Sequence, residues 1–584
     1  MRSFIKSVLA NITAIFIVFF IFFGFIIIIM ISSAIGGKDN VKIKSNSILT
    51  LDSKFRIIES ETEKDLNVFD FKSQIQDVAL YDVIRAIESA KNDDNIKGIS
   101  IENDNINAGI TQIESIRNAI EDFKKSGKFV YSYGNSVSQS SYFLGSVADK
   151  FYLNPAGGIE LKGMASEVIF LKDFAEQYGI GINIIRHGKY KAAVEPFLRN
   201  DISPENKEQL STLLSDLWSR VSNKIASSRK ISIENFQSIT DGLYGMIPDF
   251  SLKYGLVDKL MQKGEYELLL KQKIGIDTDK KLNKVSIRKY IKSIKDESNS
   301  DEKIAVLYAS GNIINGDEVT NISDEKYLEY IRDLKNDDNI KAVVLRINSP
   351  GGSANASDQI LFELQQLKLK KPLIVSFGDY AASGGYYIAM AGDKIYSEPN
   401  TITGSIGVFG VIPDFKNLAN KNGIRSDVVS TNANSKMISP ISGITEGTKN
   451  MLQNSVEQTY KRFVYFVTKN RNKTFEQVDE IAGGRVWSGK KAKELGLVDE
   501  LGSLNDAITF AVKKAKVKNY NIISYPSEIN PLEEFFKGMD KESISTYFMK
   551  QKMGSEQYYI YETINNFKKN NSKVMMQSPV KIAF

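Results

Sequence analysis

The chain has 584 residues, of which 42% are hydrophobic and 25% charged, and its formal net charge at pH 7 is +6. These values predict a globular protein of several domains, because one hydrophobic core rarely grows beyond about 250–300 residues, and they give no indication of nucleic-acid binding. The chain has no cysteine and one histidine, which excludes disulfides, thiol nucleophiles, cysteine-ligated metals and sites built from two histidines.

The chain begins with a long apolar segment. No charged residue occurs between Val8 and Gly37, and the centre of this stretch reads IFIVFFIFFGFIIIIMI. About 20 apolar residues cross a bilayer, so we expect residues 1–37 to hold a short N-terminus and a transmembrane anchor. Arg2 and Lys6 place the N-terminus in the cytoplasm by the positive-inside rule, and the rest of the chain then lies outside it. Small residues in SSAIGG leave cleavage as a signal peptide open as an alternative.

The remainder contains an internal repeat. KNDDNIKG at 91–98 recurs as KNDDNIKA at 335–342, and the same offset of 244 residues matches Tyr142 with Tyr386. A repeat of this length indicates two copies of one domain.

We predict the two copies at 46–265 and 302–515, separated by a polar, lysine-rich connector at 266–301 and followed by an extension at 516–584. Within each copy, short β-rich runs such as KAVVLRI alternate with helical stretches such as SDQILFELQQLKLK. This alternation is typical of an α/β domain with a mainly parallel sheet.

Three glycine-rich turns in the second copy carry candidate chemistry: NSPGGS at 348–353, GDYAASGGYY at 378–387 and TITGSIGVFG at 401–410. The second turn places Ser383 between a strand and a helix, where a hydroxyl can act as a nucleophile. Backbone N–H groups of Gly351, Gly352 and Gly384 are candidate oxyanion donors. The alternative is that all three are ordinary turns.

The first copy supplies an internal comparison. At the same register it has Asn107 and Ala108 in place of Gly351 and Gly352, and Gln139 in place of Ser383. Folding alone therefore does not require the serine or these glycines, which favours a site in the second copy only.

A serine nucleophile needs a base. IIRHGKYKAAVEPF, at 184–197, brings together His187, Lys189 and Lys191. An imidazole serves directly, whereas a lysine needs burial or a nearby positive charge to lower its pKa. The residues themselves do not decide which of the three is the base.

Together these segments resemble the long form of the bacterial signal peptide peptidase A family, membrane-anchored serine proteases of the ClpP/crotonase-like superfamily. The resemblance rests on GKYKAAVEPF, NSPGGS, GDYAASGGYY, TGSIGV and GRVWSG. It implies two ClpP/crotonase-like domains, with Ser383 as the nucleophile and Lys191 as the base. The first copy would supply the base and the second the nucleophile. Lys436, one residue from the register of Lys191 in the second copy, is the alternative base.

The resemblance further implies a homotetramer at the bacterial inner membrane, with its catalytic part on the periplasmic side. Such proteins degrade signal peptides left in the membrane through an acyl-enzyme, without a cofactor or metal. Two other functions stay open: an acyl-CoA enzyme of the same superfamily, which would not need Ser383, and a membrane-tethered scaffold with an inactive site.

Overall fold

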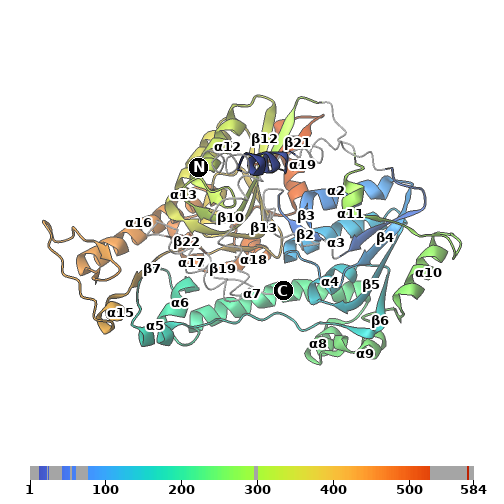
Figure 1. Ribbon diagram of the computed structural model, residues 1–584, viewed down its shortest axis with the longest axis horizontal. Helices are drawn as coiled ribbons and strands as arrows, with labels where there is room; N and C mark the ends of the chain where they lie inside the picture. Colours follow the sequence, from blue (N-terminus) through green and yellow to red (C-terminus); the bar gives the residue numbers. More distant parts are fainter. Residues whose placement is uncertain are drawn as a thin grey trace, which may run out of the picture.

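We describe the protein from a computed structural model, in residues 12–22, 24, 42–52, 55–60, 76–294, 300–526 and 575–577. Two α/β copies lie side by side, the first in blue to green and the second in yellow to red-orange (Figure 1). The first copy contains a six-stranded parallel sheet with the order β8-β6-β5-β4-β1-β9. Its strands are β1 (Ser47–Asp52), β4 (Ile96–Glu102), β5 (Phe129–Val137), β6 (Lys150–Ile159), β8 (Lys259–Leu260) and β9 (Asn283–Ser286).

The second copy repeats this topology. Its parallel strands follow the order β20-β14-β13-β12-β10-β21, each the counterpart of a strand in the first copy. They are β10 (Lys303–Ile314), β12 (Ile340–Ser353), β13 (Leu373–Ala382), β14 (Lys394–Ser397), β20 (Glu500–Leu501) and β21 (Asn521–Tyr525). The predicted duplicated α/β fold is therefore confirmed.

Helices that cover the sheets are repeated as well. The first copy has α2 (Leu80–Asn92), α3 (Ile110–Lys124), α4 (Gln139–Gly145), α7 (Pro204–Arg229), α8 (Ile233–Asp241), α9 (Pro248–Lys253) and α10 (Lys263–Lys273). Their counterparts are α12 (Asp324–Asn336), α13 (Ala354–Lys368), α14 (Gly384–Ala389), α16 (Glu446–Arg471), α17 (Phe475–Ile481), α18 (Gly489–Glu494) and α19 (Leu504–Ala515). Each copy has its own large apolar core, because helices and sheet bury one face each.

Smaller elements complete the architecture. The short helices are α5 (Lys172–Tyr178), α6 (Glu195–Leu198), α11 (Ile287–Ile291), α15 (Lys416–Lys421), η2 (Ala192–Val194) and η3 (Tyr244–Met246). The other strands are β2 (Phe55–Ile58), β3 (Gln76–Ala79), β7 (Gly181–His187), β11 (Ile322–Ser323), β15 (Ile402–Gly404), β16 (Val408–Asp414), β17 (Ile438–Ser439), β18 (Gly443–Ile444), β19 (Val486–Ser488) and β22 (Met575–Gln577).

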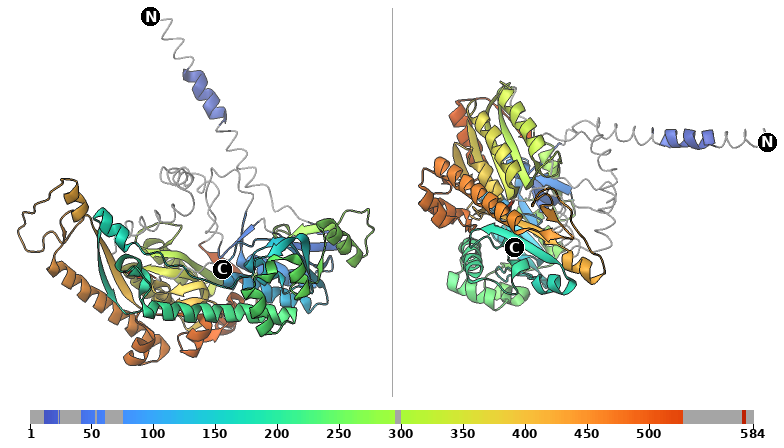
Figure 2. Two further views of the ribbon diagram at one scale, coloured as in Figure 1. Left: turned by 90° about the horizontal axis from the view of Figure 1, so that it is seen from below. Right: turned by 90° about the vertical axis from the view of Figure 1, so that its left-hand side faces the viewer.

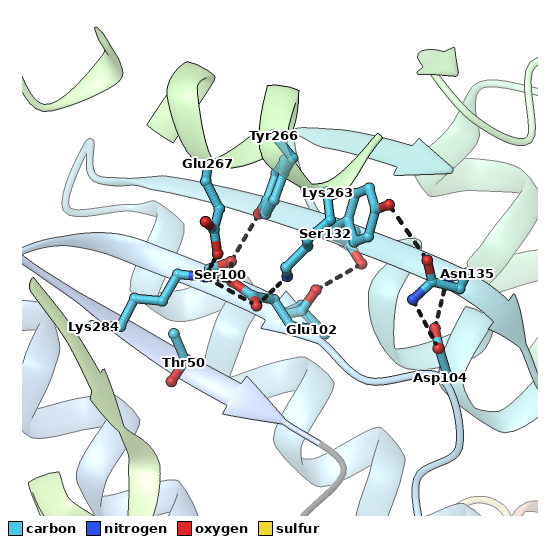
Figure 3. A network of polar contacts seen from close by, with 12 residues as sticks. Thr50, Ser100, Glu102, Asp104, Ser132, Asn135, Lys263, Tyr266, Glu267 and Lys284 are labelled. Carbon is cyan, nitrogen blue, oxygen red and sulfur yellow. Dashed lines mark hydrogen bonds and ion pairs between the residues drawn. The ribbon is translucent and has the colours of Figure 1, made fainter. Parts of the chain in front are cut away.

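Each copy extends further than its predicted boundary. Strand β9, inside the predicted connector, pairs with β1, and β21, inside the predicted extension, pairs with β10. Lys284 of β9 also forms ion pairs with Glu102 and Glu267, both at 3.0 Å, within the polar network drawn in Figure 3. Much of the connector is thus built into the first copy rather than being a solvated linker, and its lysine-rich composition concealed a short edge strand.

One segment of the first copy packs on the second copy. Strand β7 of the first copy pairs antiparallel with β16 of the second, from Gly181 opposite Asp414 to His187 opposite Val408. Helix α7 runs beneath both copies (Figure 1) and packs against the second copy in an apolar cluster of Leu210, Leu213, Leu217, Ile402 and Val486. Strand β7 and the first half of α7 therefore belong to the first copy by sequence but pack on the second, whereas Val221 and Ile225 of α7 lie in the core of the first copy.

Charged groups are buried where the copies meet. Arg346 of β12 donates to Glu59 from Nε to Oε2 at 2.8 Å, and both side chains are at most 1% exposed. Glu398 accepts a hydrogen bond from Ser115 at 2.8 Å, and burial raises its pKa to about 8. Burial likewise raises the pKa of Asp379 to about 6. Burying an ion pair costs desolvation free energy. It nevertheless favours one arrangement of the two copies, because any arrangement that left Arg346 or Glu59 buried without its partner would be strongly unfavourable.

The N-terminal apolar segment is described only in part. Residues 12–22 form a helix that stands clear of both copies (Figure 2), and its apolar side chains are exposed, for example Phe20 at 84%. Among the described residues, no helix is both long and apolar enough to span a membrane. Most of the predicted anchor, from Val8 to Gly37, lies outside them.

Candidate active site

Ser383 occupies a sharp turn between β13 and α14. Its backbone has φ 56° and ψ −115°, a conformation that side-chain-bearing residues rarely adopt. The turn is held by a hydrogen bond from Ser383 N–H to Gly404 C=O at 2.8 Å and one from Tyr387 N–H to Ser383 C=O at 2.8 Å. Such a strained turn after a strand presents the hydroxyl at the sheet edge. Ser383 is fully buried in this conformation of the chain.

Lys191 reaches Ser383 from the other copy. It lies four residues after β7, between Tyr190 and η2, and it is fully buried. Its Nζ donates to Ser383 Oγ at 2.8 Å. The pairing of β7 with β16 is what carries the lysine across the boundary between copies. The structure thus brings together Ser383 and Lys191, the two residues that the family resemblance implied from opposite copies.

Ser405 is a third member of this group and was not singled out from the sequence. Lys191 Nζ donates to Ser405 Oγ at 2.9 Å and to Ser405 C=O at 3.0 Å. The residue has φ 50°, so it too is held in an unfavourable backbone conformation. The glycine-rich turn at 401–410 was the available signal, although it gave no reason to choose the serine within it.

Burial decides the protonation of Lys191. Desolvation lowers its pKa well below the usual value of a lysine, because a charged ammonium loses its water shell in the interior. All three partners of Nζ are uncharged oxygen atoms, which compensate only in part. A neutral amine beside a hydroxyl is the state that a general base requires.

A second glycine turn supports the backbone of Lys191. Gly484 has φ 87°, and a Cβ placed on it would lie 2.6 Å from Lys191 N and 2.7 Å from Lys191 Cα. Tyr190 N–H donates to Gly483 C=O at 3.0 Å. The GRVWSG motif therefore lies directly against the lysine, and any side chain at Gly484 would push that backbone away.

The three candidate oxyanion glycines meet beside Ser383. A Cβ on Gly384 would lie 3.2 Å from both Gly351 Cα and Gly352 N. Gly351 has φ 101° and Gly352 φ 156°, which lets the chain approach this closely. Gly351 N–H donates to Ser349 Oγ at 3.1 Å, so in this conformation that donor already has a partner. The arrangement gathers the backbone of all three glycines beside Ser383.

The corresponding position in the first copy holds no serine. Gln139, in the register of Ser383, donates to Gly163 C=O at 3.0 Å and accepts from the N–H groups of Lys162 and Gly163 at 3.0 and 2.8 Å. Its amide therefore bonds to the adjacent backbone and offers no nucleophile. Ser435, in the register of Lys191, lies exposed in the second copy. Each copy thus retains one of the two groups.

The other candidate bases lie elsewhere. His187 Nδ1 is 2.7 Å from Glu457 Oε2, and its ring stacks on Tyr460 with centroids 3.6 Å apart. Lys189 Nζ lies over the Tyr190 ring, 5.2 Å from its centroid, and Lys436 is exposed. Neither of the two lysines nor the histidine has a hydrogen bond to Ser383 among the contacts of the described residues.

Comparison with known proteins agrees with this duplicated architecture. The profile of Peptidase family S49 matches residues 122–277 and again 365–518, which are equivalent parts of the two copies. The Clp protease profile matches residues 295–403.

Several relatives are similar over most of the chain. Protease 4 of Salmonella typhi is 37% identical over 476 residues, which cover 80% of this chain and 77% of that protein. Protease 4 of Haemophilus influenzae is 34% identical over 514 residues, covering 84% and 83%. An Enterococcus faecium protein named as a candidate signal peptide peptidase SppA is 35% identical over 239 residues, covering 40% of this chain and 70% of that protein. The chain belongs to peptidase family S49 and is a serine peptidase.

Proposed function

We propose that the protein hydrolyses apolar peptides, including cleaved signal peptides, with Ser383 as the nucleophile and Lys191 as the general base. The observation that carries this proposal is the 2.8 Å contact between Lys191 Nζ and Ser383 Oγ in a fully buried setting. A nucleophile within hydrogen-bond reach of a base of lowered pKa is the geometry that acyl transfer requires.

The reaction follows from the contacts. Neutral Lys191 takes the hydroxyl proton while Ser383 Oγ adds to the peptide carbonyl carbon, and the backbone amides of the glycine turns stabilise the oxyanion. Lys191 then returns the proton to the departing amine as the C–N bond breaks. A water molecule next attacks the ester, with Lys191 again as base, and releases the acid. Ser405 keeps Nζ aimed at Ser383 through two hydrogen bonds.

Signal peptides are proposed as substrates because the family relative from Enterococcus faecium carries that name and because of the expected anchor at 8–37. Arg2 and Lys6 before that segment support a cytoplasmic N-terminus and a catalytic part outside the inner membrane, in the periplasm of a bacterium. An enzyme held at the membrane surface would meet apolar peptides left there.

A serine-directed fluorophosphonate probe tests the site directly. We expect it to label Ser383 in the wild type and label at least about 100-fold more slowly in Lys191→Met, because the base activates the hydroxyl. Peptide mapping by mass spectrometry locates the label. Lys189→Met is the matched control, since it removes a neighbouring lysine that has no contact with Ser383, and its labelling should equal that of wild type. Labelling elsewhere, or undiminished labelling in Lys191→Met, would contradict the proposal.

We further propose that copies assemble head to tail, and that four of them close a ring, as the family resemblance implies. Within one chain, β7 of the first copy pairs with β16 of the second. The counterpart of β7 in the second copy, residues 425–431, forms no strand although the structure describes it. In the counterpart of β16 in the first copy, residues 164–170, only Ala165 makes a single β-bridge. Each of these two segments therefore lacks the strand pairing that its counterpart has, and a heterologous contact between them in neighbouring chains would repeat the internal one.

Side-chain exposure supports this assembly. Ile185 of β7 is 3% exposed, whereas its counterpart Val429 is 101% exposed. We expect Val429→Asp to weaken association at least about tenfold without unfolding the chain, because the charge would be buried only in the assembly. Analytical ultracentrifugation of the full chain in detergent measures this. Leu369→Asp, at another exposed position (80%), is the matched control. Equal association of both variants would contradict the proposed contact.

A further inference from the structure

One glutamine of helix α7 lies between the turn that carries Lys191 and strand β19. Gln209 is 1% exposed, and its Nε2 donates to Tyr190 C=O at 3.1 Å. On the other side, its Oε1 accepts a hydrogen bond from Val486 N–H at 3.3 Å. A single buried amide therefore joins a main-chain group of the first copy to one of the second copy.

Both of these main-chain groups lie close to the serine–lysine pair. Tyr190 directly precedes Lys191. Val486 lies opposite Gly404 in the pairing of β19 with β15, and Gly404 C=O accepts a hydrogen bond from Ser383 N–H at 2.8 Å. The glutamine thus links the backbone next to the lysine with the strands beside the serine, and the 2.8 Å contact between Nζ and Oγ closes this ring.

The position of the glutamine amide is itself fixed by buried neighbours. Gln209 Nε2 also donates to Asn206 Oδ1 at 3.0 Å, and Asn206 Nδ2 donates to Glu195 Oε2 at 2.9 Å. Ser203, the N-cap residue of α7, donates from Oγ to the same carboxylate. Glu195 follows Lys191 by four residues, so the start of α7 is held against the segment that carries the lysine.

Arg485 makes a second set of contacts between the same segments. Its C=O accepts a hydrogen bond from Ser405 N–H at 2.7 Å. Its guanidinium carbon lies 4.8 Å from the centroid of the Tyr190 ring and 4.3 Å from that of Trp487, and Nη1 donates to Tyr190 OH at 3.2 Å. Nη2 forms an ion pair with Glu208 of α7. A planar guanidinium stacks well on aromatic rings, so the tyrosine before the lysine is held through its ring as well as its backbone.

We propose that Gln209 and Arg485 are positioning residues that keep Lys191 Nζ on Ser383 Oγ, a proposal that rests on the serine–lysine function above. Neither side chain has a hydrogen bond to Lys191 Nζ or to Ser383 among the contacts of the described residues, so each acts through the backbone of the lysine turn. The equivalent position in α16 holds Met451, which is 43% exposed. The repeated fold therefore does not require a glutamine at this place.

Gln209→Met tests the proposal, because methionine has a similar length but can form neither hydrogen bond. We expect kcat for a fluorogenic apolar peptide to fall at least about tenfold, since a small displacement of a catalytic group is costly. KM should change less than about twofold, because peptide binding does not involve the glutamine. Gln237→Met is the matched control, since Gln237 is exposed and bonds to Asp241 within its own helix. It should keep the wild-type kcat.

Labelling of Ser383 by the fluorophosphonate probe distinguishes positioning from a general structural role. Gln209→Met should slow labelling in the wild-type chain but cause no further loss in Lys191→Met, because the glutamine acts through the lysine. An equal loss in both backgrounds would overturn the proposal. If Lys191→Met labels as fast as wild type, the serine–lysine function itself fails.

Arg485→Lys is the second variant, and it keeps the proposal testable if Gln209→Met does not fold, which its melting transition shows. Lysine keeps the charge but loses the planar stack on Tyr190, so we expect labelling to slow at least about threefold, again only when Lys191 is present. Wild-type labelling rates in the folded variants would overturn the proposed positioning role.

Discussion

Ser383→Ala and Lys191→Met should each reduce kcat/KM for an apolar peptide by roughly 10³-fold or more, and the double variant should lose no more than either single one. The effects of substituting two residues that act together in acyl transfer are not additive, because neither residue can activate the hydroxyl without the other. The shared hydrogen bond of 2.8 Å makes them such a pair. Rates measured with a fluorogenic substrate under subsaturating conditions check both the size of the effect and its lack of additivity.

Controls for this pair come from the repeat itself. Ser435 and Lys436 occupy the matching place in the second copy and are exposed, so Ser435→Ala and Lys436→Met should retain wild-type rates. Activity retained by Ser383→Ala would favour a reaction that uses only the backbone amides, as in acyl-CoA enzymes. A wild type without any hydrolysis would favour the scaffold.

The sequence predicted much of the architecture because the duplication is visible in it. Matching positions such as Tyr142 and Tyr386 donate equivalent hydrogen bonds, to Leu256 C=O at 2.8 Å and to Leu497 C=O at 2.7 Å. Both tyrosines are fully buried. A residue retained for the same buried contact in both copies leaves a clear signal at a constant offset.

Long-range pairing left no such signal. Nothing in GINIIRH predicts that β7 joins the other copy, because strand pairing depends on which edge is free, not on local composition. Strands β9, β21 and β22 are at most five residues long and lie in polar or mixed segments, where alternation is too brief to detect. Ser405 was missed for a related reason, since its role depends on the position that Lys191 reaches only after β7 and β16 have paired.

The deep burial of Lys191 comes from turns of the second copy. In the second copy, the segment in register with Lys191 lies exposed around Ser435, whereas Lys191 is covered by the glycine turn at Gly484 and by Gly407, whose added Cβ would lie 3.3 Å from Lys191 Cδ. This cover removes the water that would hydrate a charged ammonium group, and so lowers the pKa of Lys191. Burial therefore disfavours the charged state of Lys191, as its proposed role of general base requires.

That burial predicts a characteristic pH dependence of activity. Because only the neutral amine can accept the Ser383 proton, kcat/KM should rise with pH through the lowered pKa of Lys191. It should reach its plateau well below the ordinary lysine pKa of about 10.4. A rate profile of wild type from pH 5 to 10 measures this. His187→Gln should leave the profile unchanged, since His187 contacts Glu457 and not Ser383. If the rise of kcat/KM with pH were lost in that variant, His187 and not Lys191 would be the general base.

The same group makes stability depend on pH in a direction that can be worked out. Between the lowered pKa of folded Lys191 and its ordinary value in the unfolded chain, the unfolded state binds more protons, so the free energy of unfolding rises with pH across this window. Lys191→Met removes that contribution. Its melting temperature relative to wild type should therefore be highest near neutral pH and fall as pH approaches 10. For Lys189→Met, the difference in melting temperature from wild type should be the same at every pH. If the difference for Lys191→Met were also independent of pH, the buried lysine would have to stay charged.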